Sequence, residues 1–358
     1  MNAYFMKMLQ ISTLQKIVLV AGGMLSCGCC SVPMIAQAHP ALLADPSLAS
    51  IQQQIDRGHA AEALVELNKL AVEKPMPAGV DLLRGKALYA QNRFIDAAAA
   101  FRLAHAENSK DSEAAQLLGL TLFRLGRPAD AIPLLESAPE MSADSKVDPS
   151  YILALCYLDG RRYDDARHAF AKQYGFAGDS AQAYLLAARM LLRREYVPVA
   201  QTFARKSLEL DPQLPLAHGL LGEVALAGEH LDEAISEFEK EKARNPLDGG
   251  VYDRLGDAYA RKGDYLLAQE SLQRALLLEP NSTGPYILLG KVLIKRGDPA
   301  SARTYLERAV GMDPGNYMSH NLLGQAYRAL GRADDAAREL GMSQKIQAAS
   351  EPKLEVVK

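Results

Sequence analysis

The sequence predicts an all-α, right-handed solenoid built from about nine helix-turn-helix repeats. Glycines and prolines each recur with a 34-residue period, and one alanine stands at the equivalent place in every unit. The glycines are Gly222, Gly256, Gly290 and Gly324, and the prolines are Pro212, Pro246, Pro280 and Pro314. The alanines are Ala63, Ala97, Ala131, Ala166, Ala200, Ala234, Ala268, Ala302 and Ala336. A fixed period of this length is typical of stacked repeats.

Each period contains the pattern of two helices, as residues 249–282 illustrate. Val251 and Leu255 belong to an apolar stripe with helical spacing, which predicts helix A of the unit. Gly263 can end this helix in the left-handed conformation, and Asp264 is expected to cap the start of helix B. Helix B has its own apolar stripe and ends at the proline of the unit, because proline cannot continue a helix. The repeated small residues are expected where the two helices approach closely.

This unit resembles the tetratricopeptide repeat family. The family pattern has a small residue and a tyrosine in helix A, an alanine and a large apolar residue in helix B, and a final proline. The matching residues in residues 249–282 are Gly256, Tyr259, Ala268, Leu272 and Pro280. The resemblance extends over about 44–350 and implies a protein-binding scaffold whose helices A line a concave groove.

The repeats account for nearly all of the chain after its first segment. The predicted organisation is a signal peptide over 1–38, an extension over 39–43, repeats 1–3 over 44–146, repeats 4–9 over 147–350 and a polar tail over 351–358. A one-residue insertion interrupts the period between Pro139 and Pro149, so a bend or loosened joint is expected there. Gly175 and Gly178 also make repeat 4 irregular.

The first residues have the order of an export signal. Lys7 and Lys16 precede an apolar run, and Ala36-Gln37-Ala38 has the small-x-small form of a cleavage site. Two alternatives stay open. The run Ile17–Ala36 is long enough to remain as a membrane anchor, and Cys27 or Cys29 stands in an imperfect lipoprotein box. All three interpretations predict a protein exported to the periplasm or outer envelope of a bacterium.

Composition and spacing argue against several kinds of chemistry. The chain has 358 residues with 40 Lys and Arg against 43 Asp and Glu, so it has no basic excess for nucleic acid. The seven histidines lack metal-ligand spacing, and the chain has no phosphate-binding glycine loop. The pairs Asp164-Asp165 and Asp334-Asp335 are expected in the first turns of helices, where the helix dipole favours acids. Cys156 is expected to be a small buried residue. We therefore expect no enzyme, no cofactor and no metal site.

The remaining candidate site is the groove implied by the family resemblance. In repeats 1–4 its charged positions hold mostly acids: Asp45, Asp56, Lys86, Glu113, Arg124, Asp148 and Asp159. In repeats 5–9 they hold mostly bases: Arg189, Arg193, Glu223, Asp253, Asp257, Arg261, Lys291, Lys295 and Arg328. The candidate partner-binding residues are Arg189, Arg193, Asp257, Arg261, Lys291, Lys295, Asn321, Gln325 and Arg328. This pattern is consistent either with a solvated helix face or with a site for an acidic protein or peptide.

The sequence therefore predicts a non-enzymatic scaffold that binds a protein partner in the bacterial cell envelope. Membrane contact is expected only through the signal peptide or a lipid anchor. The alternative is an assembly factor for secretion or cell-surface polysaccharide export, for which groove aromatics such as Tyr89, Phe123 and Tyr151 would contact sugars. The family branch that clamps acidic chaperone tails is excluded, because its asparagines are missing here.

Overall fold

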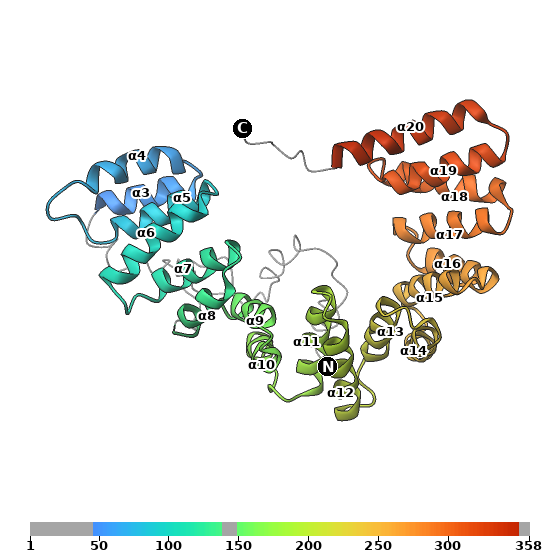
Figure 1. Cartoon of the computed structure of the whole chain (residues 1–358), viewed down its shortest axis with the longest axis horizontal. Coiled ribbons are helices and arrows are strands. Elements are labelled where there is room, and N and C mark those ends of the chain that lie inside the picture. Colours follow the sequence, from blue (N-terminus) through green and yellow to red (C-terminus); the bar gives the residue numbers. More distant parts are fainter. Residues whose placement is uncertain (1–45, 138–148, 351–358) are drawn as a thin grey trace, which may run out of the picture. The chain divides into compact units, whose positions relative to one another are not determined.

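The predicted all-α solenoid of helix-turn-helix repeats is confirmed. A computed structural model describes residues 46–137 and 149–350, and these ranges contain eighteen helices and no strand (Figure 1). The proposed signal peptide, the lipidation candidates Cys27 and Cys29, the insertion and the polar tail lie outside the described residues. In the described ranges, no helix has both the length and the hydropathy needed to cross a membrane.

The helices alternate between a helix A and a helix B in each repeat. Repeats 1–4 contain α3 (Pro46–Asp56), α4 (Ala60–Leu70), α5 (Val80–Ala90), α6 (Phe94–Glu107), α7 (Ser112–Arg124), α8 (Pro128–Ser137), α9 (Pro149–Asp159) and α10 (Tyr163–Tyr174). Repeats 5–7 contain α11 (Ala181–Arg193), α12 (Val197–Leu210), α13 (Ala217–Ala227), α14 (Leu231–Arg244), α15 (Gly249–Lys262) and α16 (Tyr265–Leu278). Repeats 8 and 9 contain α17 (Thr283–Lys295), α18 (Pro299–Met312), α19 (Tyr317–Ala329) and α20 (Ala333–Ser350).

Contacts group the chain into two compact units, Met1–Ala187 and Ala188–Lys358. The division falls inside α11, in repeat 5, whereas the insertion lies between repeats 3 and 4. In the second unit, α13, α15, α17 and α19 each pack on helix B of their own repeat and on helix B of the preceding one. Successive helices A also contact one another, as α13 contacts α15, α15 contacts α17 and α17 contacts α19. These helices therefore line a shared surface.

The repeated small residues mark the closest helix contacts, as expected. All nine repeat alanines are buried, with at most 4% of their surface exposed. A Cβ atom added to Gly256 on α15 would lie 2.5 Å from Cγ of Leu272 on α16. Helix A thus sits directly against the large apolar side chain of helix B. A larger residue at this glycine position would force the two helices apart.

The turn residues behave largely as the sequence predicts, with one correction. Gly263 is left-handed with φ of 93° and ends α15. Asp264 stands at the N-cap of α16, but its side chain accepts no capping hydrogen bond. Its carboxylate lies 3.7 Å from the Lys262 ammonium instead, so it acts as a charge partner. Asp298 does cap α18, because it accepts a hydrogen bond from the Ser301 amide at 3.0 Å.

Repeat 4 is shortened around a buried arginine. Its helix B, α10, ends at Tyr174, and Gly175 follows with φ of 72°. Arg167 is 3% exposed, pairs with Asp179 at 2.8 Å and lies 4.2 Å from the centre of the Tyr184 ring. The guanidinium thus ties the shortened helix to the loop that follows it. Cys156, in helix A of this repeat, is fully buried, as predicted.

Candidate partner-binding groove

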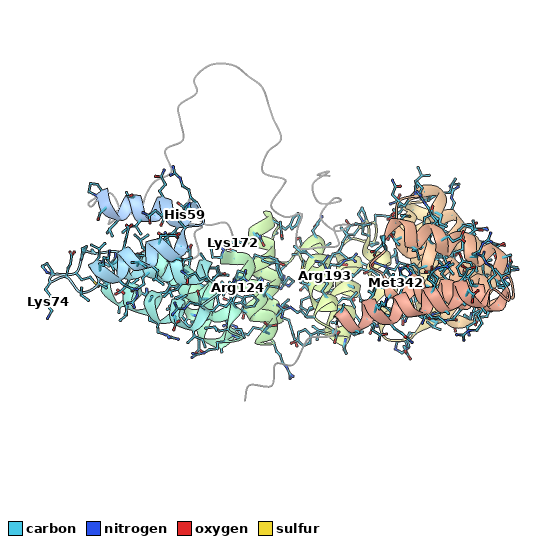
Figure 2. The ribbon with its side chains drawn as sticks, turned by 90° about the horizontal axis from the view of Figure 1, so that it is seen from above. His59, Lys74, Arg124, Lys172, Arg193 and Met342 are labelled. Carbon is cyan, nitrogen blue, oxygen red and sulfur yellow. The ribbon has the colours of Figure 1, made fainter. Side chains whose placement is uncertain are left out.

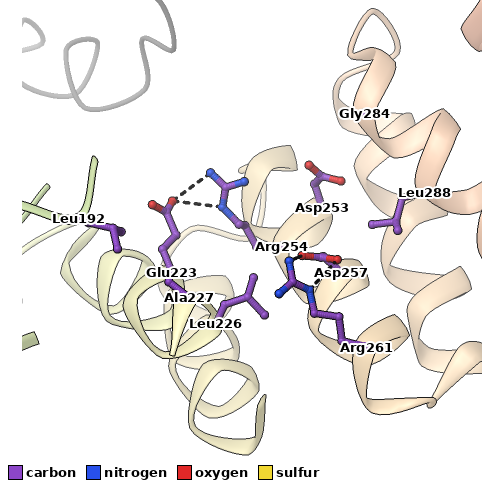
Figure 3. Close-up of a pocket in the computed structure, with 10 residues that line it drawn as sticks. All are labelled: Leu192, Glu223, Leu226, Ala227, Asp253, Arg254, Asp257, Arg261, Gly284 and Leu288. Carbon is purple, nitrogen blue, oxygen red and sulfur yellow. Dashed lines mark hydrogen bonds and ion pairs between the residues drawn. The ribbon is translucent and has the colours of Figure 1, made fainter. Parts of the chain in front are cut away.

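A cavity of about 510 Å³ opens on the surface that the helices A of the second unit share. Its lining comes from four successive helices A, namely α11, α13, α15 and α17 (Figure 3). The apolar lining residues are Leu192, Leu226, Ala227 and Leu288, and Gly284 lies at the start of α17. The charged lining residues are Glu223, Asp253, Arg254, Asp257 and Arg261. The cavity is therefore an amphipathic groove with charges of both signs.

Glu223 on α13 is the centre of an ion-pair network. Arg189 on α11 donates to its carboxylate at 2.6 Å. Arg254 on α15 approaches the same carboxylate at 3.1 Å through Nη2 and 3.2 Å through Nε. Burial works against the charge of Arg254, but Glu223, Asp253 and Asp257 together outweigh burial and raise the pKa of Arg254. This network directs the Arg254 guanidinium toward α13 and holds it there (Figure 3).

The second arginine of the cavity is also neutralised. Arg261 pairs with Asp257 one turn earlier on α15, and the closest nitrogen–oxygen distance is 2.9 Å. The pair is partly exposed, so its contribution to stability is small, in the range of about 0.3–0.5 kcal/mol for such helical pairs. Its effect on the groove is to occupy both side chains. Both arginines that line the cavity therefore form their ion pairs with acids other than Asp253.

Asp253 is the acid that remains without a partner. Its half-buried side chain accepts no hydrogen bond and makes no ion pair with the described residues. Figure 3 shows its carboxylate directed toward α17, near Gly284. Burial raises its pKa to about 6, against the attraction of Arg254 and together with repulsion from Asp257 and Glu279. Asp253 is therefore an incompletely solvated carboxylate at the edge of the cavity.

The predicted basic residues divide into paired and unpaired groups. Arg189 and Arg261 are neutralised as described above. Lys291 and Lys295 on α17 and Arg328 on α19 are exposed, and they make no ion pair with the part of the chain that the structure describes. Lys291 and Lys295 follow Gly284 and Leu288 on one helix face, because residues 284, 288, 291 and 295 recur at helical spacing. The unpaired positive charge therefore lies beside the cavity on α17 and continues onto α19.

All nine predicted site residues lie at positions equivalent to residues that line the cavity. Asp257 and Arg261 line it themselves. The position of Asp257 is held in other repeats, one or two 34-residue periods away, by Arg189, Lys291 and Gln325. The position of Arg261 is held by Arg193 (Figure 2), two periods before it, and by Lys295, one period after it. Asn321 matches Asp253, and it accepts a hydrogen bond from Gln325 at 2.6 Å. Arg328 is three periods from Leu226.

Arg254, which bridges α13 and α15, is not among the groove residues that the sequence predicts. Its signal was present in the repeat register. The equivalent residues in other repeats are Leu186, Leu220, Leu288 and Leu322. An arginine in a leucine position changes an apolar contact into a charged one, and here it adds a charged side chain to the lining of the cavity. A search for departures from the repeat pattern would have found it.

The histidines of helices A have structural partners. Nδ1 of His218 lies 2.6 Å from Glu237, and Nδ1 of His320 lies 2.7 Å from Glu339. Burial opposes the charge of Glu237, but hydrogen bonds from Lys240 and His218 lower its pKa overall. Asp165 and Asp335 pair with the arginine three residues before them, Arg162 and Arg332. Across the described ranges, no three acids, histidines or cysteines gather as a metal site.

Most of the aromatic side chains proposed for sugar contact pack against other side chains of the protein. The Arg124 guanidinium (Figure 2) lies 5.6 Å from the centre of the Tyr89 ring. The Tyr151 ring packs edge-on against Phe170, with ring centres 5.9 Å apart. Two of the three proposed aromatic platforms therefore contact the protein itself. Their geometry gives no support to the polysaccharide alternative.

Comparison with known families decides the identity of the repeats. Models of the tetratricopeptide repeat match residues 250–282 and residues 287–342, which are repeats 7 to 9 as the structure has them. The chain contains tetratricopeptide repeats. A model of anaphase-promoting complex, cyclosome, subunit 3 matches residues 90–173. As a tetratricopeptide repeat protein, the chain is a protein-interaction scaffold, a class that is typically non-catalytic.

Curated proteins are similar to parts of the chain. It is 29% identical over 97 residues to tetratricopeptide repeat domain-containing protein PYG7, chloroplastic, of Arabidopsis thaliana, covering 26% of this chain and 32% of that protein. It is 23% identical over 241 residues to superkiller complex protein 3 of Mus musculus, covering 64% of this chain and 15% of that protein. The chain thus spans no more than about a third of the length of these relatives.

Solved structures are also similar to about half of the chain. The structure of YrrB, described as a TPR protein with an unusual peptide-binding site, is 26% identical with a TM-score of 0.44, covering 51% of this chain and 95% of that one. The structure of MamA from Desulfovibrio magneticus RS-1 is 19% identical with a TM-score of 0.45, covering 49% of this chain and 98% of that one.

Proposed function

We propose that the chain is a non-enzymatic scaffold of the bacterial cell envelope that captures an acidic protein segment in its groove. The observation that carries the proposal is the unpaired charge of Lys291, Lys295 and Arg328 beside the cavity. These groups lie on two successive helices A, and all three are exposed. An acidic segment lying across α17 and α19 would meet three cations that no described residue neutralises.

The physical role of this basic strip, Lys291, Lys295 and Arg328, is capture. Exposed charges contribute little to final affinity, because water and salt screen them over about 8 Å at physiological ionic strength. They do raise the rate at which an oppositely charged segment reaches the groove. The strip is therefore expected to act on association more than on dissociation.

The test uses a defined acid probe and a charge-reversed variant. Lys291 and Lys295 are four residues apart, or about 6 Å along α17, which matches about two residues of an extended peptide. The acid probe is a short, labelled, end-blocked peptide of serine, leucine and one glutamine that contains two glutamates two positions apart. Lys291→Glu with Lys295→Glu should slow its association about tenfold at low salt, and the deficit should shrink as salt rises.

A matched control separates the strip from net charge. Lys69 and Lys345 are exposed lysines on helices B, and their reversal changes the net charge of the chain equally. Lys69→Glu with Lys345→Glu should leave the association rate within about twofold of the wild-type rate. Equal slowing by both double variants, or no slowing by either, would show that the strip does not capture acidic segments.

The envelope location is supported by the order of charged, apolar and small residues in residues 1–38. Its test is expression of the full chain in a bacterial host with a double membrane, followed by intact-mass measurement of each cell fraction. Cleavage after Ala38, lipidation at Cys27 or Cys29 and retention of Ile17–Ala36 each give a different mass. A full-length chain confined to the cytoplasmic fraction would contradict the proposal.

A further inference from the structure

The partly buried Asp253 is the feature of the groove that the basic strip does not explain. Its carboxylate lies within the same amphipathic cavity, yet acidic ligands would be repelled by it. Both neighbouring arginines are engaged elsewhere, Arg254 with Glu223 and Arg261 with Asp257. Asp257 and Glu279 add further negative charge around it. The electrostatic complement of this position is therefore a cation.

We propose that the cavity binds the lysine or arginine side chain of a protein partner, with Asp253 as the ion-pair partner of that side chain. The apolar lining supports this occupant. A basic side chain has a long aliphatic stem and a charged end, and such side chains lay their stems along apolar surfaces. Leu226 and Leu288 offer that surface, and Asp253 lies at the α17 side of it (Figure 3).

The space beside Asp253 can receive such a group. Gly284 has no side chain, and a Cβ atom added there would already lie 3.9 Å from Oδ2 of Asp253. The glycine thus leaves the approach from α17 open. The cavity of about 510 Å³ lies within the range of about 300–1,000 Å³ that is typical of ligand sites. It is large enough for one side chain together with the backbone that carries it.

This inference rests on the proposed function, since the same bound segment would contact both Asp253 and the basic strip. The helix geometry sets the spacing of charges in that segment. Lys291 is seven residues after Gly284, or about 10 Å along α17, and Lys295 is eleven residues after it, or about 16 Å. An extended peptide advances about 3.3 Å per residue. The basic residue of the partner should therefore lie about three and five positions from two acids.

Three end-blocked peptide probes test the two proposals separately. The mixed probe contains one lysine and two glutamates. The first glutamate is three positions from the lysine and the second is two positions further on. The probe is made in both chain directions. The acid probe replaces that lysine with glutamine, and the basic probe keeps the lysine but replaces both glutamates with glutamine. Each is titrated against the wild-type chain, Asp253→Asn and the control Asp334→Asn, which removes an exposed acid outside the cavity.

The mixed probe, in one of its two directions, should bind the wild-type chain about 10- to 100-fold more tightly than the acid probe does. Asp253→Asn should remove at least about nine-tenths of that difference, whereas Asp334→Asn should retain it. A second readout is the carboxyl carbon resonance of Asp253. Binding of the basic probe should lower the pKa that this resonance reports, because a cation favours the ionised carboxylate.

The outcomes distinguish the two proposals. If the acid probe binds through Lys291 and Lys295 but the lysine adds less than about twofold, the inference is wrong and the proposed function stands. If only the basic probe binds, and its binding depends on Asp253, the inference is right and the acidic partner is wrong. If no probe binds at about 1 mM, both are wrong.

Discussion

Replacing Asp253 with asparagine should stabilise the unliganded protein at neutral pH. The carboxylate is partly removed from water, has no hydrogen-bond donor among the described residues and lies near Asp257 and Glu279. Ionising it in the folded state is therefore less favourable than ionising it in the unfolded chain. Asparagine has nearly the same shape and no charge, so Asp253→Asn removes this penalty and leaves the packing unchanged.

The magnitude follows from the pKa shift. The pKa rises from an ordinary value of 3.8 to about 6 in the folded state. At 1.36 kcal/mol per pKa unit, this corresponds to at most about 3 kcal/mol of destabilisation once both states are ionised. Residual solvation and the buried amide of asparagine reduce the gain, so we expect about 1–3 kcal/mol. For a unit of this size, each kcal/mol corresponds to about 2–4 °C in Tm.

The pH dependence has a definite sign. Between about pH 4 and pH 6 the folded wild-type protein holds a proton that the unfolded chain has lost, so its stability falls as pH rises. Above about pH 6 the carboxylate is ionised in both states and the penalty is constant. The advantage of Asp253→Asn should therefore grow from near zero at pH 4 to its full value above pH 6.

Urea unfolding followed by circular dichroism at pH 4, 5, 6 and 7 measures this difference directly. Asp335→Asn is the control, because hydrogen bonds from Arg332 and Arg338 lower the pKa of Asp335. Its removal should destabilise the protein at neutral pH, and that loss should fade toward acid pH. A less stable Asp253→Asn at pH 7, or a gain that does not change with pH, would refute the reasoning about the unpaired carboxylate.

Two further predictions concern the repeat packing. Gly256→Ala should destabilise the protein by about 1–3 kcal/mol, because the new methyl group clashes with Leu272. In a Leu272→Ala background the same change should stabilise the protein by up to about 1 kcal/mol, because alanine is a better helix former than glycine. Denaturant unfolding of the wild-type chain, the two single variants and the double variant measures both effects. Glu241→Gln should lower the free energy of unfolding by about 1–2 kcal/mol, because the Glu241 carboxylate accepts hydrogen bonds from the amides of Leu216 at 3.2 Å and Gly219 at 3.0 Å. Hydrogen exchange checks this, since the amides in the first turn of α13 should be the first to exchange faster.

The repeat architecture could be predicted because its causes are local and occur nine times. A small residue such as Gly256 and an alanine such as Ala268 determine where two helices meet, and a proline such as Pro280 determines where a unit ends. Each signal is weak in one repeat, but nine copies in one register make it strong. Asp264 shows the limit of this reasoning, since its capping bond depends on a side-chain conformation that the repeat pattern does not specify.

The charge pattern of the groove was only partly predictable for a similar reason. The sequence indicated which positions face inward, but it did not indicate which charges neutralise one another. Arg189 and Arg261 count as groove cations in the sequence, yet each has an acid within 3 Å in the structure. Arg254 departs from the leucine of its register and takes up much of the charge of Glu223. Only the three-dimensional contacts show that Asp253, among the acids that line the cavity, has no partner in the described residues.

The unpaired carboxylate and the unpaired lysines have one physical explanation in common. A protein that is selected only for stability would bring Asp253 and a cation together, or replace the acid, because an isolated half-buried charge is unfavourable. The groove instead pairs its arginines with Glu223 and Asp257, and it keeps Asp253, Lys291 and Lys295 apart on two neighbouring helices. A ligand with a base and acids at matching spacing would neutralise all three at once. The same residues would then be unfavourable in the free protein and favourable in the complex, and this difference in energy is what makes a site selective for its partner.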